Sequence, residues 1–224
     1  MTSRRYRLLC PIARALDRVG DRWTLILLRD LHAGPARFTD LQTLPGIASN
    51  LLTSRLRQLE DDGLIRRRDG EYGTTLYELT KLGAQTADLL FELAAFGSRF
   101  PPDEPVKRPG NLRTIAVTLK AALQRVIEPK TDLRALLLVD REPFIVAIRN
   151  GRVDVRSGEL EDPEVTLETD YSSMIAVGDG RMDFDDFIAN HAAFTGTNSE
   201  QVQIFARSMT NAVELLRGRS SARP

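Results

Sequence analysis

Residues 46–80 read GIASNLLTSRLRQLEDDGLIRRRDGEYGTTLYELT. In the first part of this stretch, apolar side chains fall at Leu52, Leu56 and Leu59, and these spacings of four and three residues put them on one face of a helix. Gly63 can end the helix, because glycine adopts the left-handed conformation at little steric cost. The stretch therefore opens with a helix that buries one apolar face.

A basic hairpin is expected directly after this helix. Residues 64–68 (LIRRR) read as a strand, Asp69-Gly70 as turn residues and residues 74–79 as the returning strand. Successive side chains of a strand point to opposite faces, so two of the three arginines share one face and the third takes the other. At least one face should meet phosphate groups, and the three arginines are Arg66, Arg67 and Arg68.

The face of the helix opposite its leucines is polar. Its side chains can reach hydrogen-bond donors and acceptors, and they are Ser49, Asn50, Thr53, Ser54 and Arg57. A polar-faced helix followed by an arginine-bearing hairpin is the pattern of a winged helix-turn-helix, in which the N-terminal part of the recognition helix meets base edges. We therefore expect double-stranded DNA as the partner and these five residues, with the three hairpin arginines, as the DNA-binding residues.

The preceding residues supply the rest of such a domain. Residues 11–33 carry two apolar stripes interrupted at Gly20-Asp21, which predicts two helices with Asp21 near the start of the second. Pro35 ends the second helix, because proline cannot continue the backbone ladder. Residues 36–43 form a further short amphipathic segment. The predicted order is helix, helix, short helix, turn, helix and hairpin, which is the winged-helix order.

Many spaced positions of residues 8–98 resemble the HxlR-type winged-helix transcription regulators of bacteria. They are Cys10-Pro11, Ala15-Leu16-Asp17, Gly20, Trp23, Leu28-Arg29-Asp30-Leu31, Gly34-Pro35, Arg37-Phe38, Leu44-Pro45-Gly46-Ile47, Leu52, Arg55-Leu56, Leu59-Glu60, Gly63-Leu64 and Tyr77-Glu78-Leu79-Thr80. The family usually has a small polar residue after Gly-Ile, and here Ala48 stands in that place. We therefore expect the recognition helix to begin one residue later, with Ser49 as its N-cap.

The resemblance also implies a homodimer and a sensing cysteine. The strongly apolar residues 82–96 read as a helix that forms the dimer interface with residues 6–9, although packing against its own hairpin is the alternative. Several relatives of this type use a cysteine before the proline as an oxidant sensor. Cys10 stands in that place, at the N-terminus of a predicted helix, where a thiolate is favoured. The alternative is that Cys10 is a small packing residue at the dimer interface.

Composition predicts a cytoplasmic protein of two domains. The 224 residues carry a formal net charge of zero and include one cysteine, which excludes an intrachain disulfide framework. No apolar run reaches the length of a membrane span, and no signal-peptide core follows Met1. Residues 1–68 contain 13 Lys and Arg against 7 Asp and Glu, whereas residues 101–224 contain 16 against 19. This asymmetry fits a basic DNA-binding domain joined to one that does not bind DNA.

The proline-rich residues 101–111 predict a linker between the two domains. We therefore expect a DNA-binding and dimerisation domain over residues 1–100 and a second domain over residues 112–217. The second domain alternates helices and strands and predicts an α+β layer of antiparallel sheet and helices. Its expected helices cover residues 112–127, 171–177, 184–190 and 199–216, and its expected strands cover 135–140, 143–150, 152–158, 164–170 and 192–197.

Residues 112–217 resemble the sterol-carrier-protein-like fold, an α/β sandwich-like arrangement that often holds an apolar ligand between sheet and helices. The resemblance implies that this domain senses a small apolar molecule. Its candidate pocket residues come from several elements and are equally compatible with an ordinary core; they are Ile175, Phe184, Phe187, Phe194, Phe205 and Met209.

The chain shows no pattern that predicts catalysis, a cofactor or a metal. His32 and His191 have no second His or Cys at ligand spacing. The acidic residues 183–186 are expected to cap a helix, and no Ser, His and Asp arrangement, phosphate loop or dinucleotide fingerprint is found. We therefore expect a homodimeric DNA-binding regulator controlled by a small apolar ligand, and not an enzyme. The alternative is a lipid or apolar-metabolite carrier whose winged helix serves protein contacts.

Overall fold

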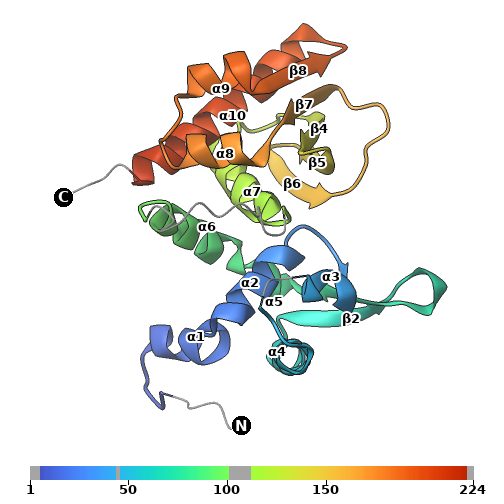
Figure 1. Ribbon diagram of the computed structural model, residues 1–224, viewed down its shortest axis with the longest axis vertical. Helices are drawn as coiled ribbons and strands as arrows, with labels where there is room; N and C mark the ends of the chain where they lie inside the picture. The colour runs from blue at the N-terminus through green and yellow to red at the C-terminus, as the bar shows by residue number, and fades with distance from the viewer. Residues whose placement is uncertain (1–5, 44–45, 101–111, 221–224) are drawn as a thin grey trace. The chain divides into compact units, whose positions relative to one another are not determined.

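The computed structural model describes residues 6–43, 46–100 and 112–220 (Figure 1). The chain divides after Thr86 into two compact units. The predicted linker, residues 101–111, lies outside the described residues, as do Leu44-Pro45 of the predicted turn. No helix among the described residues is long and apolar enough to cross a membrane.

The first unit has the predicted order of helices and hairpin. Its elements are α1 (Pro11–Val19), α2 (Arg22–Leu31), β1 (Ala36–Arg37), α3 (Phe38–Gln42), α4 (Ser49–Asp61), β2 (Ile65–Asp69), a 3-10 turn (Glu71–Gly73), β3 (Thr75–Leu79) and α5 (Lys81–Ala84). The strand β1 was not expected. It pairs with β3 through Ala36 and Tyr77 and makes a three-stranded sheet of order β1-β3-β2.

Local side-chain chemistry explains where α2 begins but not where α4 begins. Asp21 is the N-cap of α2, as predicted, and its Oδ1 accepts hydrogen bonds from the amides of Trp23 (3.0 Å) and Thr24 (3.3 Å). The prediction for α4 is wrong by one residue. Ala48 is its N-cap, without a side-chain hydrogen bond, and Ser49 is already helical.

Glycines and a threonine join α4 to the hairpin and to α5. Gly63 has φ +70°, which is the left-handed conformation expected after a helix end. Thr80 Oγ1 donates to the Gly63 carbonyl at 2.7 Å and accepts from the Gly83 amide at 3.1 Å. A Cβ atom at Gly83 would lie 2.0 Å from the Leu64 carbonyl oxygen, so only glycine permits this close approach.

The helix predicted over residues 82–96 is two helices. It breaks at Gln85, the C-cap of α5, and continues as α6 (Thr86–Gly97). Thr86 Oγ1 donates to the Gly83 carbonyl at 2.7 Å and lies 3.0 Å from His32 Nε2, which follows α2. The break therefore coincides with a tertiary contact that apolar periodicity does not reveal.

The second unit contains α6 from Ala87 onwards and a five-stranded sheet covered by helices. Its further elements are α7 (Thr114–Val126), β4 (Leu133–Val139), β5 (Glu142–Arg149), β6 (Arg152–Ser157), β7 (Val165–Thr169), α8 (Tyr171–Gly178), α9 (Phe184–Asn190), β8 (Ala192–Gly196) and α10 (Ser199–Ser220). The sheet order is β6-β5-β4-β7-β8, and α7 and α10 pack against it (Figure 1). The α+β class and all elements expected in residues 112–217 are confirmed.

The expectation of an all-antiparallel sheet is wrong for one pair of strands, because β7 runs parallel to β4. The connection of residues 158–164 returns the chain to the end of the sheet where β4 begins. Its last residue, Glu164, is held there by a hydrogen bond from its amide to the Arg134 carbonyl (2.9 Å). By contrast, the β5–β6 connection is the predicted two-residue turn, with positive φ at both Asn150 and Gly151.

The core of the second unit lies between the sheet and its helices. Alternate residues of β4 are buried, and α7 is buried around most of its circumference, as expected for a helix with apolar residues on several sides. The buried residues of α7 are Ile115, Ala116, Val117, Leu119, Ala121, Ala122 and Leu123.

Candidate nucleic-acid interface

The α4 helix presents one apolar and one polar face, as predicted. Leu52, Leu56 and Leu59 are buried. On the other side Ser49, Asn50, Ser54 and Arg57 are exposed, and Thr53 is half-buried. The structure therefore brings the five predicted helix residues together on the solvent side of one helix.

The polar residues of α4 differ in whether their side chains already form hydrogen bonds within the protein. Thr53 Oγ1 donates to the Ser49 carbonyl (2.8 Å), and Asn50 Oδ1 accepts from the Leu51 amide (2.8 Å). Arg57 makes no hydrogen bond or ion pair with any other described residue. An exposed guanidinium presents five donors in a fixed fork, which suits bidentate contact with guanine.

Ion pairs brace α4 against α1 and α2. Arg55 reaches from α4 to Asp21 Oδ2 at 3.0 Å, on the same carboxylate that caps α2. At the far end, Arg18 of α1 pairs with Asp62, the C-cap of α4. These contacts fix the orientation of the helix whose opposite face is exposed.

The hairpin β2–β3 carries the three predicted arginines, and they alternate as expected. Arg66 and Arg68 share the carboxylate of Glu78, at 2.7 Å and 3.4 Å from their Nε atoms. Arg67 points to the other face, pairs with Glu60 of α4 at 2.9 Å and lies 5.7 Å from the Tyr77 ring centroid.

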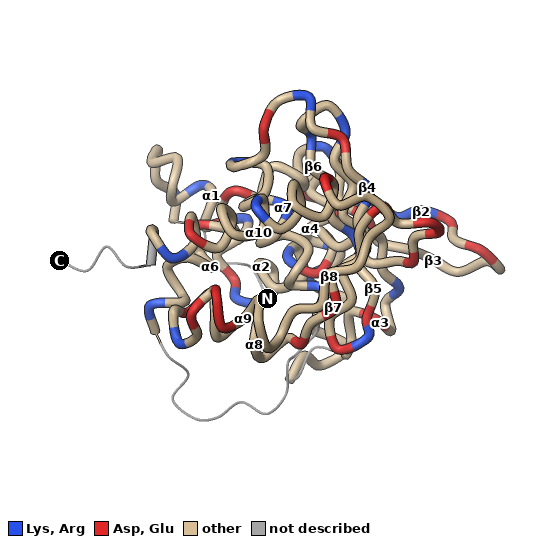
Figure 2. The backbone as a smooth tube through the Cα atoms, turned by 90° about the horizontal axis from the view of Figure 1, so that it is seen from above, with Lys and Arg blue, Asp and Glu red and all other residues tan. Residues whose placement is uncertain are grey.

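Each wing arginine therefore has an acidic neighbour. In Figure 2, acidic as well as basic residues lie along this hairpin. The wing offers a mixed charge distribution and not a purely basic surface.

Tyr72 at the tip of the hairpin was not among the residues predicted from the sequence. It adopts a left-handed conformation with φ 56°, and its side chain is 98% exposed. The sequence feature that could have pointed to Tyr72 is an aromatic residue between two glycines, Gly70 and Gly73, at a predicted hairpin turn.

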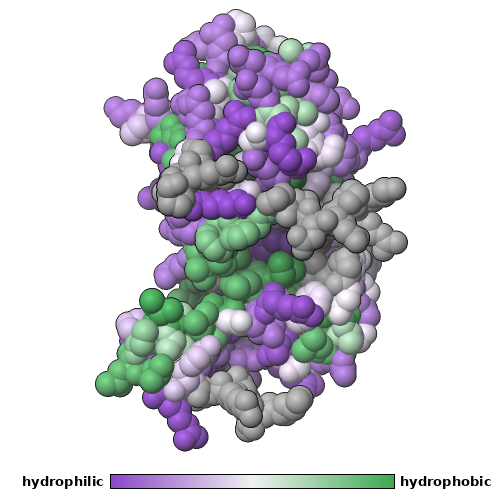
Figure 3. All heavy atoms as spheres, turned by 60° about the vertical axis from the view of Figure 1, so that its left-hand side comes forward, coloured by the Kyte–Doolittle hydropathy of each residue, from purple (hydrophilic) through white to green (hydrophobic). Residues whose placement is uncertain are grey.

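Exposed apolar residues occur in both segments that were expected to form the dimer interface. In the N-terminal segment Leu9 is 97% exposed, and Tyr6 and Leu8 are also exposed. In α6, Leu89, Leu93 and Phe96 are exposed, whereas Leu90, Phe91 and Ala95 are buried. Apolar side chains are visible on the face shown in Figure 3.

Cys10 lies where the sequence predicted, directly before the first turn of α1. It is exposed, Pro11 is the first helical residue, and the Cys10 carbonyl accepts from the Arg14 amide at 3.1 Å. The thiol is therefore accessible at a helix N-terminus.

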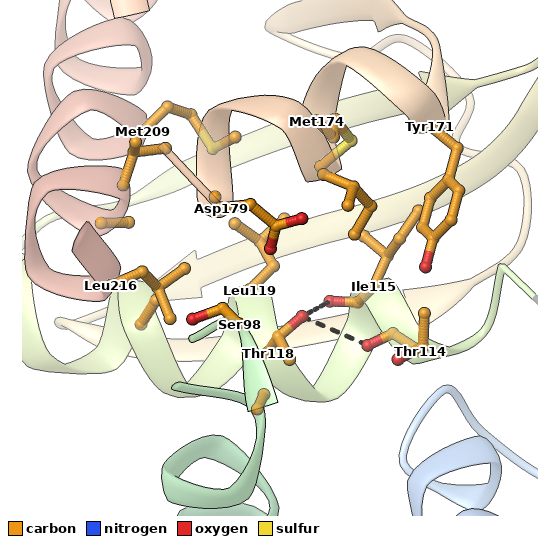
Figure 4. Close-up of a pocket in the computed structure, with 16 residues that line it drawn as sticks. Ser98, Thr114, Ile115, Thr118, Leu119, Tyr171, Met174, Asp179, Met209 and Leu216 are labelled. Carbon is orange, nitrogen blue, oxygen red and sulfur yellow. Dashed lines mark hydrogen bonds between the residues drawn. The ribbon is translucent and has the colours of Figure 1, made fainter. Parts of the chain in front are cut away.

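The six predicted pocket residues do not form one cavity. Phe205 is fully buried and packs edge-on against Phe194, with ring centroids 6.2 Å apart. Phe187 is buried against Phe184, with centroids 6.0 Å apart. A cavity of about 220 Å³ lies among α6, α7, α8 and α10, and of the six residues only Ile175 and Met209 line it (Figure 4).

The structure brings together a Ser, a His and an Asp that the sequence pattern did not predict. Ser173 Oγ donates to Asp170 Oδ2 at 2.7 Å and lies 3.0 Å from His191 Nδ1. The serine, not the histidine, is the central group. It is 4% exposed, and Asp170 caps α8 through the Ser173 amide at 2.9 Å. The arrangement therefore supports a helix cap and not the activation of a serine nucleophile, in which the histidine is central.

Hydrogen bonds determine the ionisation of Asp170. Partial burial raises its pKa, but hydrogen bonds from Ser172 and Ser173 and the charge of His191 outweigh burial and lower the pKa below 3.8. Asp183 is the N-cap of α9, the role expected for this acidic run. Within the described ranges, no group of three or more His, Cys, Asp or Glu side chains is arranged to hold a metal ion.

Comparison with known proteins identifies the first part of the chain. Residues 18–105 match the HxlR-like helix-turn-helix family. The HTH-type transcriptional regulator YdeP of Bacillus subtilis is 33% identical over 94 residues, which cover 41% of this chain and 73% of YdeP. YtcD of the same organism is 31% identical over 101 residues, which cover 44% of this chain and 79% of YtcD.

Among solved structures, the redox regulator HypR in its oxidised form is 28% identical, with a TM-score of 0.40. That match covers 42% of this chain and 99% of HypR. The winged helix-turn-helix elements, the family match and the identity to YdeP agree. The chain belongs to the HxlR-like helix-turn-helix family.

Proposed function

We propose that this protein is a transcription regulator that reads DNA with the exposed face of α4. The arrangement of Arg57 carries this proposal. Its guanidinium is exposed and makes no ion pair with any described residue. The helix is held by an ion pair of Arg55 near its middle and by an ion pair of Arg18 at its C-cap. Because the helix backbone is already held in place, the main entropic cost of meeting a base edge is the ordering of the Arg57 side chain, about 0.5–1.5 kcal/mol. One bidentate contact to guanine contributes about 1–3 kcal/mol of discrimination.

The wing supplies contacts to the DNA backbone in this proposal. Arg66 and Arg68 have exposed side chains, and among the described residues a single carboxylate, that of Glu78, pairs with both. That face of the wing therefore keeps a net positive charge, which favours phosphate independently of base sequence. Arg67 stabilises the wing against α4 through Glu60 and takes a smaller part in DNA binding.

We also propose that the regulator is a homodimer. Leu9, Leu93 and Phe96 are large apolar side chains in contact with water, and a second copy of the chain would cover them. A two-fold dimer would place two α4 helices on half-sites about one helical turn apart.

Residues 112–217 are proposed to form a sterol-carrier-like domain that controls DNA binding through a small apolar ligand. A five-stranded sheet with helices against it and a largely apolar cavity among the helices support this assignment.

Cys10 is a second candidate sensor, because its thiol is exposed at a helix N-terminus. To test this, the DNA affinity of the wild type and of a Cys10→Ser variant is measured before and after treatment with a mild peroxide. A change in the wild type alone would show that oxidation of Cys10 controls DNA affinity.

Selection of duplexes from a random DNA pool with the full chain tests the DNA-binding proposal. Fluorescence anisotropy then compares wild type with Arg57→Ala on the selected site. The matched control is Arg207→Ala, an exposed arginine of α10 in the other unit. We expect Arg57→Ala to lose about 1–3 kcal/mol of preference for the selected base and Arg207→Ala to lose none. Failure to enrich any duplex at low salt would refute the proposal.

A further inference from the structure

The cavity among the helices of the second unit has walls from four helices. Ala94 comes from α6 and Ser98 directly follows it, Leu119 comes from α7, Tyr171 from α8 and Leu216 from α10. Figure 4 shows Ser98, Leu119 and Leu216 around the same space, with Asp179 reaching toward it from the end of α8. Most of the lining is apolar.

The cavity fits a compact molecule. Its volume of about 220 Å³ exceeds the roughly 150 Å³ of an apolar cavity that takes up benzene. It falls short of the roughly 300–1,000 Å³ typical of drug-sized sites. A molecule of one or two fused rings therefore fills it, whereas a sterol or a long acyl chain exceeds it.

The polar groups in the wall favour a ligand that donates hydrogen bonds. Thr118 Oγ1 directs its proton to its own helix, 3.2 Å from the carbonyls of Thr114 and Ile115, and keeps acceptor capacity. Asp179 contributes a carboxylate, which forms an ion pair with Arg181 at 3.1 Å and keeps further acceptor capacity. Among the described residues, the lining includes no Lys, Arg or His. A neutral or cationic donor is therefore favoured, and an anion is disfavoured by Asp179.

The α6 helix connects this cavity to the DNA-binding unit through the chain. Its C-terminal end forms part of the cavity wall through Ala94 and the following Ser98. Its first half is held to α7, because Arg125 pairs with Asp88 at 2.7 Å and its guanidinium carbon lies 4.3 Å from the Phe91 ring centroid.

Thr86, the first residue of α6, is held by a hydrogen bond within the first unit. Thr86 belongs to the first unit and hydrogen-bonds to His32 at the end of α2. A molecule in the cavity thus touches a helix whose start is fixed to the winged-helix unit. Such a contact can change DNA affinity if the molecule prefers one of two positions of α6.

We propose that this cavity is an effector site for a compact ring molecule that carries a hydrogen-bond donor, and that its occupancy changes DNA affinity through α6. The regulatory part rests on the proposed DNA-binding function. The ligand class differs from the fatty acids and sterols that the general resemblance of the domain would favour. Both are larger than the cavity and would extend beyond it, and the Asp179 carboxylate disfavours the anionic head group of a fatty acid.

Three probes of similar size test the ligand class on the full chain by calorimetric titration. They are indole, a neutral donor; benzylamine, a cationic donor; and benzoate, an anion without a donor. We expect indole and benzylamine to bind and benzoate not to bind. Asp179→Asn should weaken benzylamine by about tenfold, the size expected for a hydrogen bond to a charged group, and leave indole nearly unchanged.

A blocking variant tests the location of the site. Ala94→Trp fills the cavity from α6 and should abolish binding of indole. Ala189→Trp places the same side chain at an exposed position of α9 and should leave binding intact. Binding of indole by Ala94→Trp, or tighter binding of benzoate than of the two donors, would overturn the proposal. So would failure of both donors to bind.

DNA affinity measured with and without indole tests the coupling. We expect a change of about fivefold or more, within the usual range for allosteric coupling, and no change in Ala94→Trp. If Ala94→Trp does not fold, Asp179→Asn with benzylamine supplies a second readout, because this variant should need about tenfold more benzylamine than wild type for the same change in DNA affinity. DNA binding that is intact but insensitive to bound indole refutes the coupling alone. Absence of DNA binding refutes the proposed function, and the titrations then still decide the ligand site.

Discussion

At the scale of single residues, Asp21 has two structural tasks. One carboxylate oxygen caps α2 through the amides of Trp23 and Thr24, and the other pairs with Arg55 of the recognition helix. The Arg55 guanidinium also donates to Gln58 Oε1 at 3.1 Å, whereas its buried Nε has no partner among the described residues.

Two variants of Asp21 separate these tasks. Asp21→Asn keeps an oxygen for the cap and removes the charge, whereas Asp21→Ala removes both. We expect Asp21→Ala to lower the free energy of unfolding by about 1–3 kcal/mol, and Asp21→Asn to lower it less. Urea denaturation of the full chain measures both values. Equal stability of Asp21→Ala and wild type would contradict the role of this residue.

Asp170 makes the stability of the second unit dependent on acid. Burial opposes its ionisation, but hydrogen bonds from Ser172 and Ser173 and the charge of His191 lower its pKa below the usual 3.8. A lowered pKa in the folded state means that the carboxylate stabilises the fold above pH 3.8 and that this contribution disappears as pH falls through the lower value.

The stability difference between wild type and Asp170→Asn should therefore shrink in acid. We expect wild type to be the more stable at about pH 6 and the advantage to decrease as pH falls below about 4, the range in which aspartate titrates. Urea denaturation at a series of pH values measures the difference. An advantage that stays constant across this range would show that the charge of Asp170 does not contribute.

Single residues were predictable where a local rule applies. Asp21 starts α2, and Gly63 and the pair Asn150-Gly151 adopt positive φ, because each conformation depends on only a few neighbouring residues. Contacts between distant residues were not predictable. Ser173 and His191 are 18 residues apart, and only the fold brings them within 3.0 Å.

At the scale of secondary-structure elements, the wing gives two predictions of opposite sign. Replacing Arg66, Arg67 and Arg68 together by Ala should reduce the slope of log affinity against log salt by about 0.9 for each phosphate that the wing then leaves unneutralised. Glu78→Gln removes the carboxylate shared by Arg66 and Arg68 and should increase the slope. Anisotropy titrations over a range of salt concentrations measure both. Slopes that do not move in either variant would exclude the wing from the DNA interface.

Elements were predictable where apolar residues repeat regularly. The alternation in β4 and the four-three spacing in α4 identify a strand and a helix without reference to the rest of the chain. The two-residue strand β1 is too short to show a period. The break at Gln85 and the parallel pairing of β4 with β7 depend on tertiary hydrogen bonds, so the sequence pattern did not reveal them.

At the scale of the whole molecule, the exposed apolar residues predict dimerisation. Leu93→Gln combined with Phe96→Gln should convert the chain to a monomer, because burial of their apolar surface drives association. Sedimentation equilibrium at micromolar concentration measures the mass. The control is Tyr72→Ser, which removes an exposed aromatic residue from the wing tip. A dimer that persists in the double variant would place the interface elsewhere.

The two candidate sites differed in how well the sequence predicted them. The polar face of α4 that we propose to bind DNA follows from helical periodicity, so its residues were identified together. A cavity has no such period, because core and pocket residues share the same composition. Four of the proposed pocket residues are phenylalanines that pack in pairs, and the cavity was instead found among helices that include α6.

Footprinting combined with methylation interference on the selected duplex tests the central claim most directly. A two-fold dimer that reads DNA through α4 should protect two major-groove segments with centres about 10–10.5 base pairs, or a multiple of that, apart. Arg57→Ala should lose interference at one guanine in each segment and keep the backbone protection. Protection of a single segment, or guanine interference that is unchanged in Arg57→Ala, would contradict the account.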